Sequence, residues 1–405
     1  MTLTLLLDLD DTLLINNMET FLPVYFHSLG KYMAHHESPQ RFISTLTNAA
    51  GAMIANDQPD RTLQEAFNAA FFPILGLNAE QVTEDFETFY LNEFPSLQPL
   101  TNFSPKAHQL VKDALNRDFT LVIATNPLFP RIAIEERMRW AGISTKDIPI
   151  KLITSFETFH FSKPNLAYYA EILARLGWPE RASLMVGDDL ENDILPANRL
   201  GIPAFWVKPD GAFHLEEHYS TPLATGSIDQ IIPWLDQIPI EELQPSFNYP
   251  DAYLAVLKST PACLASFFEQ ISNDIWKQRP QEGEWCLTEI ICHLRDVEKE
   301  VNLPRLKKAI QELNPFLPGM DTDPWANERQ YIQQDGPIAL SEFVQARLET
   351  LELFNSLSSE DWIRPVRHAI FGPTQLEELA KINAGHDRMH VRQVYQTLKA
   401  LNIQP

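Results

Sequence analysis

Two patterns of hydrophobic positions divide the chain. Its first half carries short, continuous apolar runs separated by segments with helical spacing. Strands buried on both faces of a parallel sheet have this composition, because neither face needs polar side chains. We therefore expect strands within 2–10, 119–125, 150–155, 182–189 and 202–207, in an α/β domain whose parallel sheet is covered by helices.

The segment between the first two expected strands, about residues 16–100, has a different pattern. Its apolar residues recur at helical spacing, as in SPQRFISTLTNAAGAMIA and TLQEAFNAAFFPIL, and it has almost no strand signal. We expect this insertion to form a helical cap, that is, a lid over the sheet.

The second half is nearly all helical. We expect helices over 250–276, 287–311, 338–356 and 374–401. Four helices of this length predict an antiparallel four-helix bundle. The connection over 312–337 is too long for a tight hairpin, so we expect it to cross one end of the bundle.

A proline-rich stretch, DQIPIEELQPSFNYP (236–250), separates the halves, and such a composition stops helices and stiffens a connection. The expected fold class is α/β plus all-α: a Rossmann-like parallel sheet with a helical cap insertion, followed by an antiparallel four-helix bundle. The expected parts are a first domain over 1–238, with its core in 1–15 and 101–238 and its cap in 16–100, a linker over 239–249, and the bundle over 250–405.

Composition excludes several classes of protein. The chain has 405 residues, of which 44% are hydrophobic and 21% are charged, as in ordinary globular domains. Its net charge of -22 repels nucleic-acid phosphates and anionic lipids, so we expect neither nucleic acid nor membrane as a partner. The three cysteines include no CxxC pair, which favours a reducing compartment, and we expect a cytoplasmic protein. The oligomeric state stays open.

Acidic side chains cluster where two of the expected strands end. Asp8 and Asp10 follow the first strand, and Asp188 and Asp193 follow the fourth. Ligands of an open parallel sheet bind at the carboxyl ends of its strands, so these side chains should converge. Clustered carboxylates with open coordination positions favour Mg²⁺. A carboxylate can also attack phosphorus and form an aspartyl-phosphate intermediate, while a second carboxyl group transfers the proton.

Other polar residues follow neighbouring strands. Thr125 and Asn126, at the end of FTLVIATN, offer a hydroxyl group and backbone N–H groups to a phosphoryl oxygen. Lys163, in FSKPN, adds a positive charge. We therefore expect Thr125, Asn126 and Lys163 to bind substrate.

The segments DLDDTL, LVIATN, FSKPN and GDDLENDI, in this order, resemble the four motifs of the haloacid dehalogenase-like (HAD) superfamily over residues 1 to about 238. The resemblance implies a phosphohydrolase whose cap selects a small phosphorylated metabolite. It implies that Asp8 is the nucleophile and Asp10 the acid/base, that Thr125 holds the phosphoryl group, and that Lys163 stabilises the nucleophile.

The same resemblance implies a metal site. Mg²⁺ would be bound by Asp8, by the carbonyl oxygen of Asp10 and by Asp188, with Asp193 supporting the site. Asp10 also favours phosphoester over carbon–halide hydrolysis, because a departing halide needs no proton. A domain retained only as a scaffold is the alternative.

Histidines form the second candidate site. His386 and His390 are spaced i, i+4 on an apolar helix face, and His293 faces inward on the second expected helix. Three neutral imidazoles in a bundle core suit Zn²⁺, Ni²⁺, Fe²⁺ or Mn²⁺. Buried histidines with ordinary hydrogen bonds are the alternative.

GEWCLTEIICHLRDVE and the later HDRMHVRQV resemble the DinB/YfiT-like superfamily over about 247–405. The resemblance implies that His293, His386 and His390 are metal ligands. Some relatives are similar to thiol-dependent transferases. The bundle could therefore be the main actor, as a metal-dependent transferase or isomerase that uses a low-molecular-weight thiol, or it could be a non-enzymatic metal- or ligand-binding module.

Five further side chains lie near these histidines in the sequence. Asp296, Glu298 and Asp387 are candidates to hydrogen-bond the metal-binding rings. We expect Cys292 to be a packed residue, because it points away from His293 around the helix, and we expect His368 to lie in a loop.

Overall fold

The computed structural model describes residues 3–208, 212–216, 221–269 and 271–404. The chain folds as two compact units, which are Met1–Tyr168 with Glu180–Ser246, and Tyr169–Pro179 with Phe247–Pro405. The domain limits expected from the sequence remain predictions. No helix in the described part of the chain is both long and apolar enough to span a bilayer.

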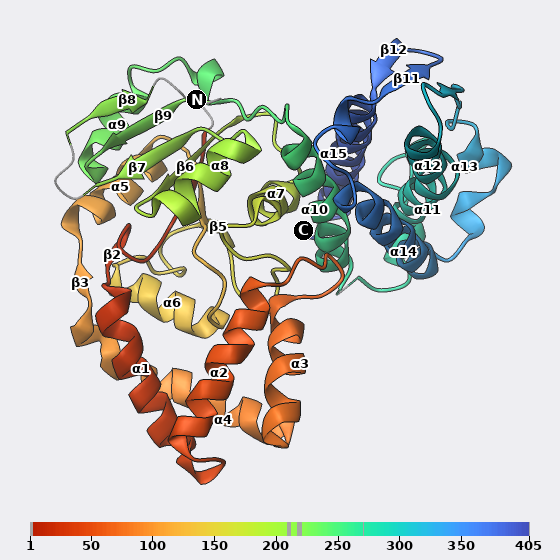
Figure 1. Cartoon of the computed structure of the whole chain (residues 1–405). Helices are drawn as coiled ribbons and strands as arrows, with labels where there is room; N and C mark the ends of the chain where they lie inside the picture. The colour runs from red at the N-terminus through yellow and green to blue at the C-terminus, as the bar shows by residue number, and fades with distance from the viewer. Residues whose placement is uncertain (1–2, 209–211, 217–220, 270, 405) are drawn as a thin grey trace. The chain divides into compact units, whose positions relative to one another are not determined.

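A seven-stranded sheet forms the centre of the first unit (Figure 1), in the order β5-β4-β1-β6-β7-β9-β8. Neighbouring strands are parallel except at β8–β9. The strands are β1 (Leu3–Leu7), β4 (Thr120–Ile123), β5 (Ile150–Ile153), β6 (Ala182–Gly187), β7 (Ala204–Val207), β8 (His214–Glu216) and β9 (Leu223–Gly226). The α/β class is confirmed, and every expected strand is present, although residue 2 of the first range lies outside the described residues. The sequence did not indicate β8 or β9.

The central strand β1 explains why the apolar runs mark this sheet. All five of its residues are buried, and it pairs with β4 on one side and with β6 on the other. A strand enclosed on both faces consists mostly of consecutive apolar residues, and the sequence shows such a run here. The first unit also contains α5 (Pro105–Asn116), α6 (Arg131–Trp140), α8 (Leu195–Leu200) and α9 (Ile231–Leu235). Helix α7 (Leu166–Arg175) belongs to the second unit from Tyr169 onward.

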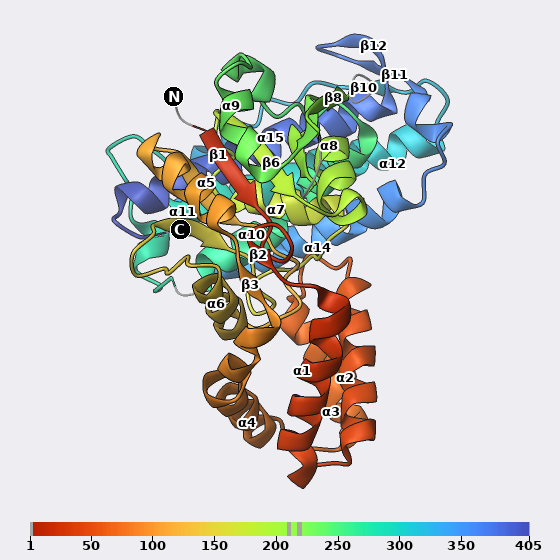
Figure 2. The ribbon, with the colours of Figure 1, turned by 90° about the vertical axis from the view of Figure 1, so that its left-hand side faces the viewer.

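A helical cap projects from the sheet, as both views show (Figures 1 and 2). It begins and ends at a short antiparallel pair, β2 (Leu14–Ile15) and β3 (Asn102–Phe103). Its segments are α1 (Met18–Tyr32), the 3-10 turn η1 (Met33–His35), α2 (Pro39–Ile54), α3 (Leu63–Leu75), α4 (Ala79–Asn92) and the 3-10 segment η2 (Phe94–Leu100). The side chain of Asn17 caps α1, and Thr62 with Glu65 forms a capping box on α3. The expected helical insertion is therefore present.

The second unit contains the expected four-helix bundle. Its helices are α10 (Pro250–Phe268), α11 (Leu287–Val297) continued through the π-turn η7 (Glu298–Asn302) into α12 (Leu303–Gln311), α14 (Gly336–Asn355) and α15 (Leu376–Ala400). The prediction that the first helix reaches residue 276 is wrong, because α10 ends at Phe268. The following segment contains Ser272 and Asp274, whose side chains hydrogen-bond each other and favour turns over helix.

Short strands and a short helix lie in the connections between the bundle helices. The connection over 312–337 contains β10 (Phe316–Leu317) and α13 (Trp325–Glu328). β10 pairs in parallel with β11 (Pro365–His368), which pairs in turn with β12 (Gly372–Gln375). The prediction of a loop position for His368 is wrong: it ends β11, opposite Leu317, and is buried. β11 therefore lies between β12, its neighbour in the chain, and the distant β10.

Candidate functional site

Most of the acidic and polar residues selected from the sequence lie at one edge of the sheet. Parallel strands bring their carboxyl ends to a common edge, and the loops that leave these ends carry the side chains. Asp8 follows β1, Thr125 and Asn126 follow β4, Lys163 lies between β5 and α7, Asp188 follows β6, and Asp193 lies in the π-turn η3 (Leu190–Ile194).

Lys163 lies at the centre of this group. Its Nζ donates to Asp8 Oδ1 at 2.7 Å and to Asp193 Oδ1 at 2.5 Å. All three side chains are buried. One ammonium group therefore balances two carboxylates that are far apart in the sequence, and it orients Asp8 at the end of β1.

Asp188 is the third carboxylate of the group. Its Oδ1 accepts a hydrogen bond from the Thr12 hydroxyl at 3.1 Å, and its carbonyl oxygen accepts one from Trp206 Nε1 at 2.8 Å. One ligand oxygen from each of Asp8, Asp188 and Asp193 lies within 4.8 Å of the others. This spacing of hard oxygen ligands fits a divalent cation such as Mg²⁺.

Gly187, the last residue of β6, allows this approach. A Cβ atom at Gly187 would lie 2.2 Å from Asp193 Oδ2. No other residue leaves that space, so the glycine is required for Asp193 to reach the strand end.

Burial shapes the charges of these carboxylates. Burial raises the pKa of Asp8, although Lys163 opposes the rise. Burial and then the charge of Asp8 raise the pKa of Asp188 to about 7 and that of Asp193 to about 8. The three acids thus repel one another, and Lys163 alone does not offset them. A bound divalent cation would relieve this repulsion.

The Asp10 carboxylate points to different partners. Its Oδ1 accepts from Asn16 Nδ2 at 2.7 Å, and its Oδ2 accepts from Nη1 of Arg137, a buried residue of α6. The guanidinium carbon of Arg137 lies 4.5 Å from the centre of the Phe129 ring. The side chain of Asp10 is therefore held by two donors, and the sequence did not indicate Arg137, which belongs to no short motif.

Thr125 and Asn126 lie in the loop that follows β4. The carbonyl oxygen of Thr125 accepts hydrogen bonds from the hydroxyl groups of Thr154 and Tyr168, both at 2.7 Å. Asn126 Oδ1 is buried and has no hydrogen-bond partner within the described residues. The two hydrogen bonds fix the backbone of this loop at Thr125.

The bundle brings the three selected histidines together. His293 of α11 and His386 and His390 of α15 place their Nε2 atoms side by side, at 3.1 Å for His293–His386 and 3.1 Å for His390–His386. One ring nitrogen from each lies within 4.8 Å of the others. Three imidazole nitrogens at this spacing form one face of a coordination site for a transition metal.

Burial keeps these rings neutral. It lowers the pKa of His293 to about 3, with help from His390, and lowers the pKa of His386 well below its usual value. His390 Nδ1 lies 2.9 Å from Gln393 Oε1. The sequence did not indicate the role of Trp285, whose ring is stacked on His390 with centroids 6.3 Å apart.

The expectation that nearby carboxylates would hydrogen-bond these rings is wrong. Glu298 and Asp387 both bind the buried guanidinium group of Arg347, and Asp296 Oδ2 accepts from Arg329 Nη1 at 2.7 Å. The carboxylates are turned to arginines because an unpaired buried charge costs more than a polar contact to a neutral ring gains.

Cys292 is a packed residue, as expected. Its side chain is buried, and its Sγ lies 3.6 Å from Gln334 Oε1. Burial raises the pKa of the thiol to about 11, so it stays protonated and unreactive at neutral pH.

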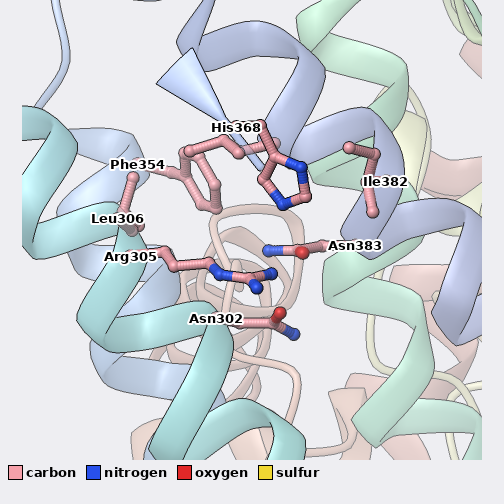
Figure 3. Close-up of a pocket in the computed structure, with 8 residues that line it drawn as sticks. Asn302, Arg305, Leu306, Phe354, His368, Ile382 and Asn383 are labelled. Atoms are coloured by element: carbon pink, nitrogen blue, oxygen red, sulfur yellow. The ribbon is translucent and has the colours of Figure 1, made fainter. Parts of the chain in front are cut away.

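A small pocket lies in the bundle one helical turn of α15 before His386 (Figure 3). The guanidinium group of Arg305 and the side-chain amides of Asn302 and Asn383 point toward the same space. Its lining contains no acidic residue and consists of Asn302, Arg305, Leu306, Phe354, His368, Leu379, Ile382 and Asn383.

Comparisons with known families agree with the two folds. Residues 160–229 match the model of the HAD-hydrolase-like family, and residues 257–394 match the model of the DinB superfamily.

Two curated proteins are similar to parts of the chain. One is the pyrimidine 5'-nucleotidase PynA of Streptococcus pneumoniae, 31% identical over 114 residues, which are 28% of this chain and 44% of the nucleotidase. The chain thus matches less than half of that enzyme. The other is OB0782 of Oceanobacillus iheyensis, whose name describes a metal-dependent hydrolase, 25% identical over 144 residues, which are 35% of this chain and 82% of that protein.

Solved structures also resemble each half of the chain. YfiT from Bacillus subtilis is 18% identical, with a TM-score of 0.36, and covers 40% of this chain and 94% of its own. A HAD phosphatase from Thermococcus onnurineus is 16% identical, with a TM-score of 0.37, and covers 57% of this chain and 97% of its own. On the two family matches, the chain joins a HAD-like hydrolase domain to a domain of the DinB superfamily.

Proposed function

We propose that the HAD-like domain is a Mg²⁺-dependent phosphohydrolase that acts on a small phosphorylated metabolite through an aspartyl-phosphate intermediate. The observation that carries the proposal is the contact between the Asp8 carboxylate and Lys163 Nζ, 2.7 Å long, at a buried sheet edge where Asp188 and Asp193 also lie. A nucleophilic carboxylate must be oriented and kept dry, and this arrangement supports both requirements.

In the proposed reaction, an oxygen of Asp8 attacks phosphorus while the ester oxygen leaves. Asp10 gives its proton to the leaving oxygen, and the aspartyl-phosphate is left on Asp8. Asp10 then takes a proton from a water molecule, whose oxygen attacks phosphorus. The bond between phosphorus and the Asp8 oxygen breaks, which releases inorganic phosphate and regenerates the Asp8 carboxylate. Thr125 and Asn126 bind the phosphoryl oxygens, and Lys163 offsets the charge of Asp8.

The donor set fits the proposed metal. Asp8, Asp188 and the carbonyl oxygen of Asp10 would hold Mg²⁺, while Asp193, whose Oδ1 accepts from Lys163 and whose Oδ2 accepts from the backbone N–H of Asp189, supports the site. When bound, Mg²⁺ supplies positive charge to the phosphoryl oxygens.

The cap and the likeness to a nucleotidase support a phosphate monoester of small size as the substrate class. Three buried, unpaired cysteines support the cytoplasm as the compartment of the protein.

For the bundle, we propose that His293, His386 and His390 hold a divalent transition metal, namely Zn²⁺, Ni²⁺, Fe²⁺ or Mn²⁺. The supporting observation is the convergence of three neutral Nε2 atoms, 3.1 Å apart along two sides. The second candidate function is a metal- and thiol-dependent transferase or isomerase, in which the three histidines would hold the metal. A non-enzymatic metal-binding module is the remaining alternative.

Phosphate release from the wild-type chain and from Asp8→Asn tests the first proposal. The panel should contain pyrimidine and purine 5'-monophosphates and sugar phosphates, each with Mg²⁺ and with a chelator. Release that requires both Mg²⁺ and Asp8 is the expected result, and equal release by Asp8→Asn would refute the mechanism. Metal-dependent consumption of a low-molecular-weight thiol that is lost in His386→Ala would favour the second candidate function.

A further inference from the structure

A third group of metal-ligating side chains lies in the cap, outside both sites described above. His35, the last residue of η1, and the adjacent His36 face Asp85 of α4. The distances to Asp85 Oδ2 are 3.1 Å from His35 Nε2 and 2.5 Å from His36 Nε2. Two imidazole nitrogens from one corner thus meet the carboxylate of a helix about fifty residues later in the chain.

The hydrogen bond on the far side of His35 determines which ring nitrogen faces the carboxylate as an acceptor. His35 Nδ1 lies 3.0 Å from the carbonyl oxygen of Tyr32, and a carbonyl oxygen can only accept. Nδ1 therefore carries the hydrogen, and Nε2 of the neutral ring carries a lone pair. That lone pair faces an oxygen of Asp85, which is also an acceptor. Such a contact requires a cation between the two atoms, either a proton or a metal ion.

The geometry accommodates a metal ion. One ligand atom from each of His35, His36 and Asp85 lies within 4.8 Å of the others. Two ligands of a tetrahedral zinc ion with bonds of about 2.0–2.1 Å stand roughly 3.3 Å apart, so only small side-chain movements are needed. A backbone carbonyl oxygen on the opposite ring nitrogen is also the usual partner of a metal-bound histidine.

Exposure differs among the three side chains. His36 is 9% exposed and Asp85 is 27% exposed, whereas His35 is 53% exposed. An ion bound here would be anchored by His36 and Asp85 and would keep a coordination position open to water. Imidazole nitrogens select transition metals over Mg²⁺, which prefers oxygen ligands.

We propose that His35, His36 and Asp85 form a binding site for a divalent transition metal of the zinc type, which ties the corner between α1 and α2 to α4. The site is separate from the proposed phosphohydrolase chemistry, so it stands or falls independently of that activity.

A zinc titration of the full chain tests the proposal. The chain is stripped with a chelator and kept in excess Mg²⁺ at pH 7.5, so that the carboxylate site at the sheet edge is occupied. Calorimetry then compares the wild type with His36→Gln and Asp85→Asn, and with His27→Gln as a matched control from α1. The expected result is one equivalent of Zn²⁺ fewer in His36→Gln and Asp85→Asn, and no change in His27→Gln. Equal stoichiometry and affinity in all four proteins would overturn the proposal.

A second measurement needs no variant in the cap. His386→Ala weakens the bundle site, and one equivalent of Co²⁺ added to this protein above pH 7 should still give visible absorption bands that Zn²⁺ abolishes. Absence of these bands would mean that His35 and His36 hold a proton against Asp85 and no metal, and would also overturn the proposal.

Discussion

Two buried clusters in this chain have the same pattern of charges but differ in how fully their hydrogen bonds and charges are balanced. In each, one basic side chain lies between two carboxylates, and all six side chains are buried or nearly so. The lysine cluster of the first unit consists of Lys163, Asp8 and Asp193, and the arginine cluster of the second unit consists of Arg347, Glu298 and Asp387.

Every nitrogen of the guanidinium group is used in the arginine cluster. Nε and Nη2 of Arg347 donate to the two oxygens of Glu298 at 3.0 and 2.9 Å, and Nη2 also donates to Asp387 Oδ1 at 3.0 Å. Nη1 donates to Asp387 Oδ2 and to the carbonyl oxygen of Leu257. Burial would raise the pKa of Glu298, but Arg347 outweighs burial and the pKa is lowered. Burial still raises the pKa of Asp387, although Arg347 opposes the rise. The hydrogen bonds of the guanidinium group are nevertheless all satisfied, and the cluster ties α14 to the neighbouring helices.

The lysine cluster is not satisfied in the same way. An ammonium group is a point charge without the planar fork of arginine. Asp188 adds a third carboxylate nearby, and the pKa values of Asp8, Asp188 and Asp193 are all raised. This cluster therefore retains an excess of negative charge at the ligand-binding edge of a sheet. The comparison teaches that unmet electrostatic demand, rather than buried charge as such, marks a candidate active site.

The largest expected effect is a loss of phosphate release when the lysine cluster is changed. Asp8→Asn should reduce phosphate release by at least about 10³-fold, or about 4 kcal/mol in the barrier, because an amide cannot act as the nucleophile. The melting temperature should not fall, since burial already disfavours the Asp8 charge. Steady-state phosphate release and thermal unfolding of the same preparation check both statements. A lowered melting temperature would show that the lysine cluster also stabilises the fold.

Arg347→Met should have the converse effect. Removal of the guanidinium group leaves Glu298 and Asp387 unpaired, which should lower the free energy of unfolding of the second unit by about 3–5 kcal/mol. Denaturant unfolding followed by far-UV circular dichroism measures the loss.

The matched control for Arg347→Met combines it with Glu298→Gln and Asp387→Asn. This variant contains no buried charge in the cluster, so most of the stability should return. If the triple variant is as unstable as Arg347→Met, packing rather than charge accounts for the loss.

A third prediction extends the comparison to the neutral histidines that lie beside the arginine cluster. His386→Ala removes one of three proposed ligands and should weaken Zn²⁺ binding by the bundle by at least about 100-fold. Asp8-dependent phosphate release should stay within twofold of the wild type. Competition with a chromophoric zinc chelator measures the affinity, and unchanged bundle affinity would exclude His386 as a ligand.

The smallest expected effect concerns the hydrogen bond that Thr12 donates to Asp188. Thr12→Val removes the hydroxyl group that donates to Asp188 Oδ1 at 3.1 Å. The Mg²⁺ concentration for half-maximal phosphate release should rise about tenfold, because the neighbours that orient a metal ligand commonly contribute that much. Thr12→Ser keeps the hydroxyl group and should behave as the wild type. Equal Mg²⁺ dependence of Thr12→Val and Thr12→Ser would show that this contact does not affect the metal.

The sequence by itself determined the elements and the residues with chemical potential. Continuous apolar runs mark strands such as β1 and β6, because strands enclosed on both faces need no polar positions. The carboxyl ends of such strands then place Asp8 and Asp188 at one edge. The i, i+4 spacing of His386 and His390 likewise sets both rings on one helix face. These inferences depend only on local periodicity and on the direction of strands.

Tertiary structure alone decided which partners the buried charged side chains and the short strands contact. Arg137 contacts Asp10 across 127 residues, Arg347 takes two of the three carboxylates that the sequence assigned to the histidines, and β11 brings His368 beside the distant β10. Buried charges select their partners by which opposite charge the packing brings near, and no spacing along the chain encodes that choice. Sequence therefore identified the groups that can react, whereas packing determined which of them are satisfied and which are left to bind a ligand.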